Sequence, residues 1–167
     1  MLRNDTKLDK LVNKAVDLAE DELFEESLSM YDKALKMSKG NTKILADKAL
    51  TLVAANREKE ALPLYEIAIK SDPENPDILT NMGATFHSLE RYDDALRMYK
   101  RAINVCPNHA LALAYSGCTY AEMGHDADAL DSLEAAVRID GNFTKLLEDI
   151  CETLDEYMIP HTLTKKR

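Results

Sequence analysis

Apolar residues recur along this chain at intervals of three and four positions, and the whole arrangement repeats every 34 residues. One register of this period holds only leucine, at Leu11, Leu45, Leu79, Leu113 and Leu147. Another holds only small side chains, at Ala15, Ala49, Gly83, Gly117 and Cys151. Intervals of three and four are typical of one face of an α-helix, whereas a half-buried strand alternates every two residues. The pattern therefore predicts a repeated helical unit.

Each unit is expected to contain two helices. In the third unit, Leu79 and Phe86 belong to the apolar face of a first helix, and Leu96 and Tyr99 belong to that of a second. The polar segment 90–94 between them predicts a turn and places acidic residues near the positive end of the second helix. A short turn makes the two helices antiparallel. Because one pair cannot bury both of its apolar faces, neighbouring pairs must stack.

The period divides the chain into four units and three flanking segments. The units are residues 8–41, 42–75, 76–109 and 110–143, after a short N-terminal extension at 1–7. A further helix at 144–159 carries acidic residues on one side, as a terminal cap needs, and a basic tail that we expect to be flexible follows at 160–167. Pro63 lies inside the second helix of unit two, where we expect a slight kink and no break.

Composition narrows the class of protein. Of the 167 residues, 46% are hydrophobic and 31% are charged, which is enough apolar material for a packed core. A net charge of −9 disfavours nucleic-acid binding. No apolar run approaches the roughly 18 residues that span a bilayer, so membrane insertion is not expected. The N-terminus lacks a signal-peptide pattern, and we therefore expect a soluble, cytoplasmic protein.

The chain shows no recognisable catalytic or metal-binding pattern. It lacks the nucleophile elbow, the P-loop, the zinc-protease motif and the glycine pattern of dinucleotide sites. Cys106 and His109 have the spacing of metal ligands, but two ligands do not complete a tetrahedral site. The three cysteines are odd in number and include no CxxC pair, which indicates reduced thiols. We therefore expect no enzyme activity, no cofactor and no metal.

The order of small and large residues within a unit resembles the tetratricopeptide repeat (TPR) family. Unit three matches that family's order at Leu79, Gly83, Phe86, Tyr92, Ala95, Tyr99, Ala102 and Pro107. Unit one is degenerate, because Ser27 replaces the usual alanine and Lys39 replaces the closing proline. The resemblance covers about residues 8–159. It implies an all-α, right-handed superhelical solenoid of antiparallel helix pairs that binds other proteins.

The resemblance also implies where a partner would bind. In TPR arrays the first helix of each pair lines a concave groove that holds a peptide or a helix. The candidate groove residues are Val12, Asn13, Val16, Lys43, Asp47, Leu50, Asp77, Asn81, His87, Tyr115, Cys118 and Glu122. The resemblance also predicts that three smaller residues, Ala46, Thr80 and Ala114, line the groove.

The implied lining is both acidic and apolar. Its charged residues are the five acids Asp9, Glu20, Asp47, Asp77 and Glu122 and one base, Lys43, which gives −4. Its larger apolar residues are Val12, Val16, Leu50, Val53 and Tyr115. A contiguous exposed apolar strip indicates a partner, although packing against the neighbouring first helix explains Val53 equally well. We expect a protein partner, either a peptide or an amphipathic helix, with apolar side chains and some Lys or Arg.

Several functions fit such a groove. The leading hypothesis is a non-catalytic adaptor or scaffold that binds a segment of another protein. A secretion-type chaperone that holds an extended client is an alternative, although such chaperones generally have a long segment before their repeats. An accessory subunit of a glycosyltransferase-like enzyme is another. The last is a homo-oligomer in which the end or tail of one molecule fills the groove of the next.

Overall fold

The computed structural model describes residues 6–156, with side chains to Glu152. Over this range the chain is helical. The helices are α1 (Lys7–Glu20), α2 (Phe24–Met37), α3 (Thr42–Ala54), α4 (Glu58–Ser71), α5 (Pro76–Ser88), α6 (Tyr92–Val105), α7 (Ala110–Glu122), α8 (Asp126–Ile139), the short 3₁₀ helix η1 (Gly141–Phe143) and α9 (Thr144–Glu156). The rest of the helix expected at 144–159, and the tail, lie outside the described residues.

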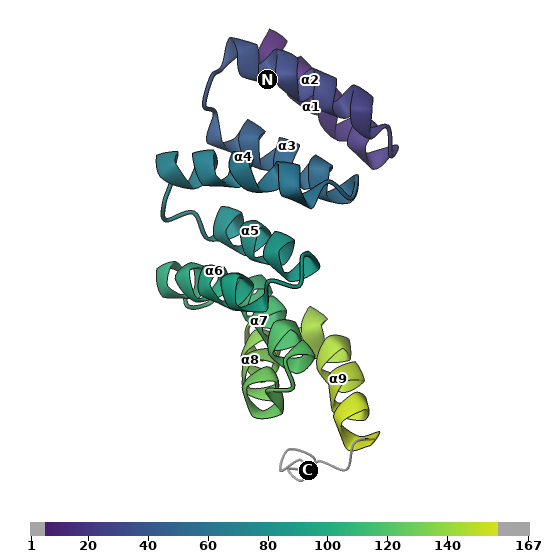
Figure 1. Cartoon of the computed structure of the whole chain (residues 1–167), viewed down its shortest axis with the longest axis vertical. Helices are drawn as coiled ribbons and strands as arrows, with labels where there is room; N and C mark the ends of the chain where they lie inside the picture. The colour runs from purple at the N-terminus through teal and green to yellow at the C-terminus, as the bar shows by residue number, and fades with distance from the viewer. Residues whose placement is uncertain (1–5, 157–167) are drawn as a thin grey trace, which may run out of the picture.

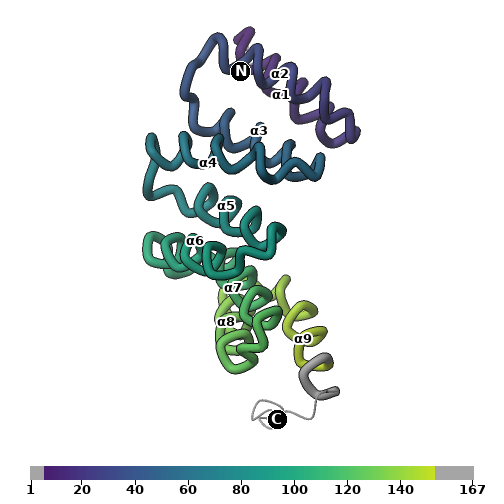
Figure 2. Tube along the Cα trace, in the orientation of Figure 1, coloured from purple at the N-terminus to yellow at the C-terminus, as the bar shows by residue number. Residues whose placement is uncertain are grey.

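The helices form an all-α solenoid of stacked pairs (Figure 1). Helix α1 packs on α2, α3 on α4, α5 on α6 and α7 on α8, while α2, α4 and α6 each pack on the first helix of the next pair. The Cα trace shows the successive pairs following one another, with α1 and α9 at opposite ends of the stack (Figure 2). The first helices α1, α3, α5 and α7 are also neighbours of one another. This neighbour-to-neighbour packing places the first helices side by side.

Side-chain caps begin the first helices of the later pairs. The side-chain oxygen of Asn41 accepts the backbone N–H of Ile44 at 3.2 Å, and Asn75 accepts that of Ile78 at 3.1 Å. In the last pair His109 takes the same place, and its Nδ1 accepts the N–H of Ala112 at 3.2 Å. Each cap satisfies a backbone donor that has no partner inside its helix. The 34-residue period therefore includes helix starts as well as apolar positions.

The turn inside each pair needs one residue with a positive φ. These residues are Glu22, Asn56, Glu90 and Gly124, with φ of 61°, 57°, 57° and 72°. The backbone N–H of Arg91, after Glu90, bonds to the carbonyl of Phe86 at 2.9 Å, which is the Schellman arrangement at a helix end. The turn is shorter than the predicted segment 90–94, because α6 already begins at Tyr92.

The core follows the 34-residue period. Tyr31, Tyr65, Tyr99 and Leu133 occupy one register and are almost fully buried. The backbone of Gly83 in α5 approaches the ring of Tyr99 in α6, so closely that an added Cβ would lie 2.5 Å from Tyr99 Cε1. Helix α4 continues through Pro63 without a break. Within residues 6–156, none of the helices is long and apolar enough to cross a membrane.

A threonine on each following first helix lies beside a buried tyrosine. The Thr85 hydroxyl donates to the carbonyl of Asn81 at 2.8 Å and lies next to Tyr65. Thr51 lies beside Tyr31 in the same way, and Thr119 lies beside Tyr99. In all three cases the threonine follows the tyrosine by 20 residues in the sequence. Burial raises the pKa of all three phenols, that of Tyr31 to about 12. These hydroxyls therefore stay protonated and neutral at the boundaries between pairs.

Tyr65→Phe is expected to leave the free energy of unfolding unchanged or to raise it by up to about 1 kcal/mol. The Tyr65 hydroxyl is buried and has no hydrogen bond of good geometry in the described part of the chain, so removing it loses no bond. Urea unfolding followed by circular dichroism measures the change. As the matched control, Tyr65→Ala empties a fully buried site and should cost about 3–5 kcal/mol. A loss above 1 kcal/mol for the phenylalanine variant would contradict the expectation.

Candidate functional site

A pocket of about 320 Å³ opens between the first helices of the first two pairs. We call it the Asp47 pocket, and it is lined by Val16, Ala19 and Glu20 of α1, Tyr31 of α2, and Asp47, Leu50, Thr51 and Ala54 of α3. Most of this lining is apolar, with the acids Glu20 and Asp47 as its charged members. The side chains of Val16 and Leu50 remain 37% and 42% exposed. Exposed apolar side chains in a concave site are what a partner can bury.

Small residues keep this pocket open. Ala19 and Ala54 stand where larger side chains would close the space between α1 and α3. Toward the next pair, Val53 packs against the main core, and in the last pair the Tyr115 ring lies 6.1 Å from that of Tyr99. The pocket therefore depends on the local choice of small side chains at the boundary between the first two pairs.

Asp47 gives the pocket its chemistry. Its carboxylate is half-buried, and among the described side chains, which end at Glu152, none donates a hydrogen bond to it. Burial raises the pKa of Asp47, and the ammonium of Lys43, one helical turn earlier, offsets only part of this effect. The negative charge of Asp47 also contributes to the raised pKa of Tyr31. A half-buried carboxylate without a hydrogen-bond donor is costly, and a cationic side chain entering the pocket would reduce that cost.

Asp47→Asn is expected to stabilise the free protein at neutral pH. Because the folded-state pKa is raised, the folded chain holds this proton more tightly than the unfolded chain. The contribution of Asp47 to stability therefore falls as the pH rises from the ordinary value of 3.8 through the raised one. Thermal unfolding should give a higher midpoint for the variant at neutral pH and nearly equal midpoints below pH 3.8. A lower midpoint at neutral pH would mean that the Asp47 charge stabilises the fold.

The structure brings three of the twelve candidate groove residues, Val16, Asp47 and Leu50, into the Asp47 pocket. Asn13, Lys43 and Glu122 are exposed outside its lining, and Asn81 is half-buried. Val12 packs partly into a small core cluster around Tyr31. The twelve residues therefore do not form one continuous site.

The remaining candidates are occupied by contacts between the third and fourth pairs. Asp77 Oδ1 accepts a hydrogen bond from His109 Nε2 at 3.0 Å, since His109 Nδ1 already accepts a backbone N–H. His87 Nδ1 is hydrogen-bonded to Thr119 Oγ1 at 2.9 Å. Cys118 is half-buried, and burial raises the pKa of its thiol. Asp77 and His87 therefore join the third pair to the fourth.

Some lining expectations are wrong. Ala46, Thr80 and Ala114 are buried in a stack whose first helices contact one another, so they do not line an open groove. Val53 and Tyr115 are partly buried against the main core and do not extend an exposed apolar strip. The apolar surface that remains at the pocket is therefore smaller than the sequence suggests.

Sequence reasoning missed the contributions of Tyr31 and Thr51 to the pocket. Both belong to the repeating tyrosine and threonine pattern, in which the threonine follows 20 residues after the tyrosine. That pattern marks the point where a second helix meets the next first helix. At the first of these points, Tyr31 and Thr51 also line the Asp47 pocket.

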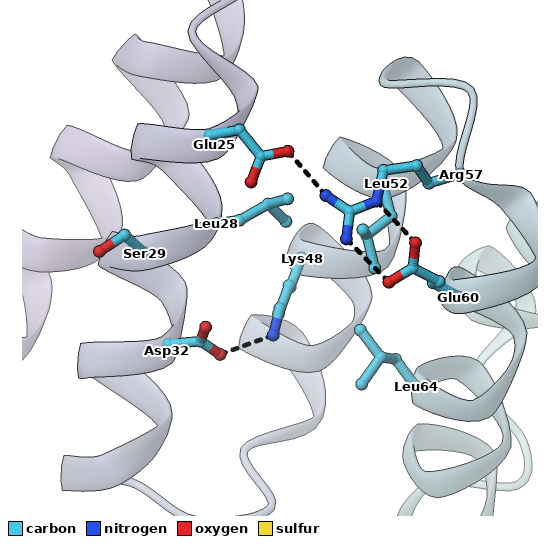
Figure 3. A pocket seen from close by; sticks show the side chains of 9 residues that line it. All are labelled: Glu25, Leu28, Ser29, Asp32, Lys48, Leu52, Arg57, Glu60 and Leu64. Carbon is cyan, nitrogen blue, oxygen red and sulfur yellow. Dashed lines mark hydrogen bonds and ion pairs between the residues drawn. The ribbon is translucent and has the colours of Figure 1, made fainter.

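A second pocket, of about 350 Å³, lies between α2 and α4 over the side of α3 (Figure 3). Arg57 bridges Glu25 and Glu60, with its NH1 2.8 Å from the Glu25 carboxylate and its Nε 2.7 Å from that of Glu60. Lys48 Nζ lies 2.6 Å from Asp32 Oδ1. Hydrogen bonding to Arg57 lowers the pKa of Glu60. The cations here already have carboxylate partners, and the bridges connect the first pair to the second.

Within the described residues, no group of three or more His, Cys, Asp or Glu side chains is arranged to hold a metal ion. Cys106 and His109 flank the turn before α7, and His109 is used there as a helix cap. The expectations of no metal and no catalysis stay predictions.

Comparisons with known proteins agree with the fold. Residues 12–76 and 75–141 each match a family model described as tetratricopeptide repeat. Similar solved structures include MamA, at 18% identity and a TM-score of 0.72 over 89% of this chain and 85% of that one. YrrB, described as a TPR protein with an unusual peptide-binding site, is 21% identical, with a TM-score of 0.72 over 90% of this chain and 76% of that one. MamA 41-end from Desulfovibrio magneticus RS-1 is 15% identical, with a TM-score of 0.72 over 81% and 77%. No curated protein matches the sequence.

Proposed function

Because the chain belongs to the tetratricopeptide repeat family, we propose that it is a non-catalytic adaptor that holds a segment of a protein partner on its first-helix face. The Asp47 pocket is the centre of this site. TPR proteins mediate protein–protein interaction. For this chain we propose in addition where the partner binds and which side chains contact it. The cytoplasmic location stays a prediction.

The observation that carries the proposal is an exposed apolar surface next to an acid that accepts no hydrogen bond from the described side chains. Val16 and Leu50 offer an apolar contact, and Asp47 lies within the same pocket. A partner with an apolar side chain beside a Lys or Arg would bury Val16 and Leu50 and neutralise Asp47. Glu20 at the same pocket adds a second negative charge. This chemistry agrees with the expected partner segment, apolar with some Lys or Arg.

The test is capture of partners with the wild-type chain and with pocket variants side by side. Leu50→Lys and Asp47→Asn should each reduce recovery of the specific partner in quantitative mass spectrometry. Ile67→Lys on α4 is the matched control, because Ile67 is 46% exposed, close to the 42% of Leu50, and does not line the pocket. Equal recovery by Leu50→Lys and by Ile67→Lys would place the contact elsewhere.

The captured segment also separates the alternative functions. A chaperone would protect one extended client that is bound over several repeats. An accessory subunit would bring down a catalytic chain and would have no turnover alone. Both would use the same first-helix face, so these outcomes refine the adaptor proposal.

A further inference from the structure

We propose that the Asp47 pocket receives the segment 157–167 of a second copy of this chain. The inference rests on the proposed function, because it names a partner for the same site. The segment reads Tyr157-Met-Ile-Pro-His-Thr-Leu-Thr-Lys-Lys-Arg167. It combines apolar side chains, which the apolar lining of the pocket can contact, with cations, which can pair with its two acids.

Charge complementarity favours this occupant. The segment holds three bases and no acid, so it carries +3 with its histidine neutral. The whole chain carries −9, and the rest of it therefore carries −9 − 3 = −12. Opposite charges on the two surfaces attract one another and set the register of the contact. The basic segment 157–167 is therefore attracted to the acidic pocket of another copy.

The spacing of the segment fits the spacing of the pocket. In an extended peptide, residues two apart point to the same side, so Leu163 and Lys165 would face one surface about 7 Å apart. Asp47 and Leu50 are one helical turn apart on α3, with Cβ atoms about 5–6 Å from each other. Leu163 can therefore contact Leu50 while the Lys165 ammonium reaches Asp47. The cation supplies the partner that this carboxylate lacks.

Geometry favours a second copy over the chain's own pocket. Helix α9 lies at the opposite end of the stack from α1 and α3, and its C-terminal end points away from them (Figure 1). Leu163 follows Glu156 by seven residues, which extend over at most about 25 Å. The path from α9 past α7 and α5 to α3 crosses three helix spacings of about 8–10 Å each, before any detour around α9. The segment is therefore too short to place Leu163 in its own pocket.

Peptide binding tests the contact directly. The receptor is the full chain with Lys165→Glu, Lys166→Glu and Arg167→Glu, so that its own segment does not compete. A fluorescent peptide of residues 157–167 should bind this receptor, and adding Asp47→Asn should weaken binding by about tenfold or more, as expected for a charged hydrogen bond. The Ile67→Lys control should bind as the receptor does. Absent binding, or binding insensitive to Asp47 and Leu50, overturns the inference.

Self-association tests the role of the second copy. The wild-type chain should show a mass that rises with concentration in sedimentation velocity, while the tail-reversed triple variant and Asp47→Lys should each remain monomeric. Mixing those two variants should restore association, because the basic segment of the Asp47→Lys chain fits the unchanged pocket of the triple variant. The acidic segment of the triple variant also faces a lysine at position 47 of the other chain. A wild-type chain that stays monomeric, or a mixture that fails to associate, overturns the proposal.

These results also separate this inference from the proposed function. If the peptide does not bind while Leu50→Lys still loses another captured protein, the second-copy contact is wrong and the adaptor site stands. If neither the peptide nor any partner responds to the pocket variants, both proposals fail.

Discussion

Gly83→Leu should destabilise the chain by about 3 kcal/mol or more, at the upper end of the cost of overpacking. A Cβ at this position would already lie 2.5 Å from Cε1 and 2.7 Å from Cδ1 of Tyr99. Tyr99 is 1% exposed, so its ring cannot turn aside into solvent. For a chain of this length, the melting midpoint should fall by roughly 6–12 °C.

Two further variants make this result specific to the crossing of α5 and α6. Gly141→Leu is the matched control, because nothing lies within 4 Å of its added Cβ, and it should change stability by about 0.5 kcal/mol or less. Tyr99→Ala in the Gly83→Leu background should cost less than the sum of the two single changes, because it vacates the space that the leucine needs. Additive losses, or a normal melting curve for Gly83→Leu, would contradict the close contact.

The sequence was sufficient for the solenoid because each unit repeats the same physical requirement. Small residues such as Gly83 must stand where a large residue such as Tyr99 crosses, and this pairing recurs every 34 residues. The turns were harder to predict. Glu22 and Glu90 adopt positive φ in the turns inside their pairs, whereas the corresponding residue of the last pair is Gly124, a residue type that signals such a turn. The backbone imposes that conformation through the Schellman bonds, so the glutamates give no local signal.

The candidate site was predictable only in part, because a position in the repeat does not determine how closely neighbouring first helices approach. Asp47 and Leu50 were found through the family's groove positions, and both line the pocket. Tyr115 stands at the position of Asp47 two units later, yet its ring packs beside Tyr99. The two boundaries differ in side-chain size, since the small Ala19 and Ala54 line the pocket at the first one and the large Tyr115 fills the space at the last. Thus the same register gives a pocket at one boundary and a packed contact at another.

Leu50→Lys should weaken binding to the pocket by at least about thirtyfold, the effect of losing a central interface contact. The new ammonium lies one turn from Asp47, where it can pair with the carboxylate and compete with a cation of the partner. Helicity and stability should change little, because Leu50 is 42% exposed. Tyr115→Lys is a poorer probe, since it would break the contact with Tyr99 and disturb the core.

Val16→Lys on the facing helix provides the independent check on this prediction. Val16 contributes to the same pocket from α1 and is 37% exposed, so the variant should fold and should lose the same partner as Leu50→Lys. Fluorescence titration with a pocket-binding peptide, and circular dichroism on the same samples, separate binding from folding. Because the two residues contact one bound segment, the double variant should lose less than the sum of the single losses. Strict additivity, or a loss in one variant only, would mean that α1 and α3 do not share one binding site.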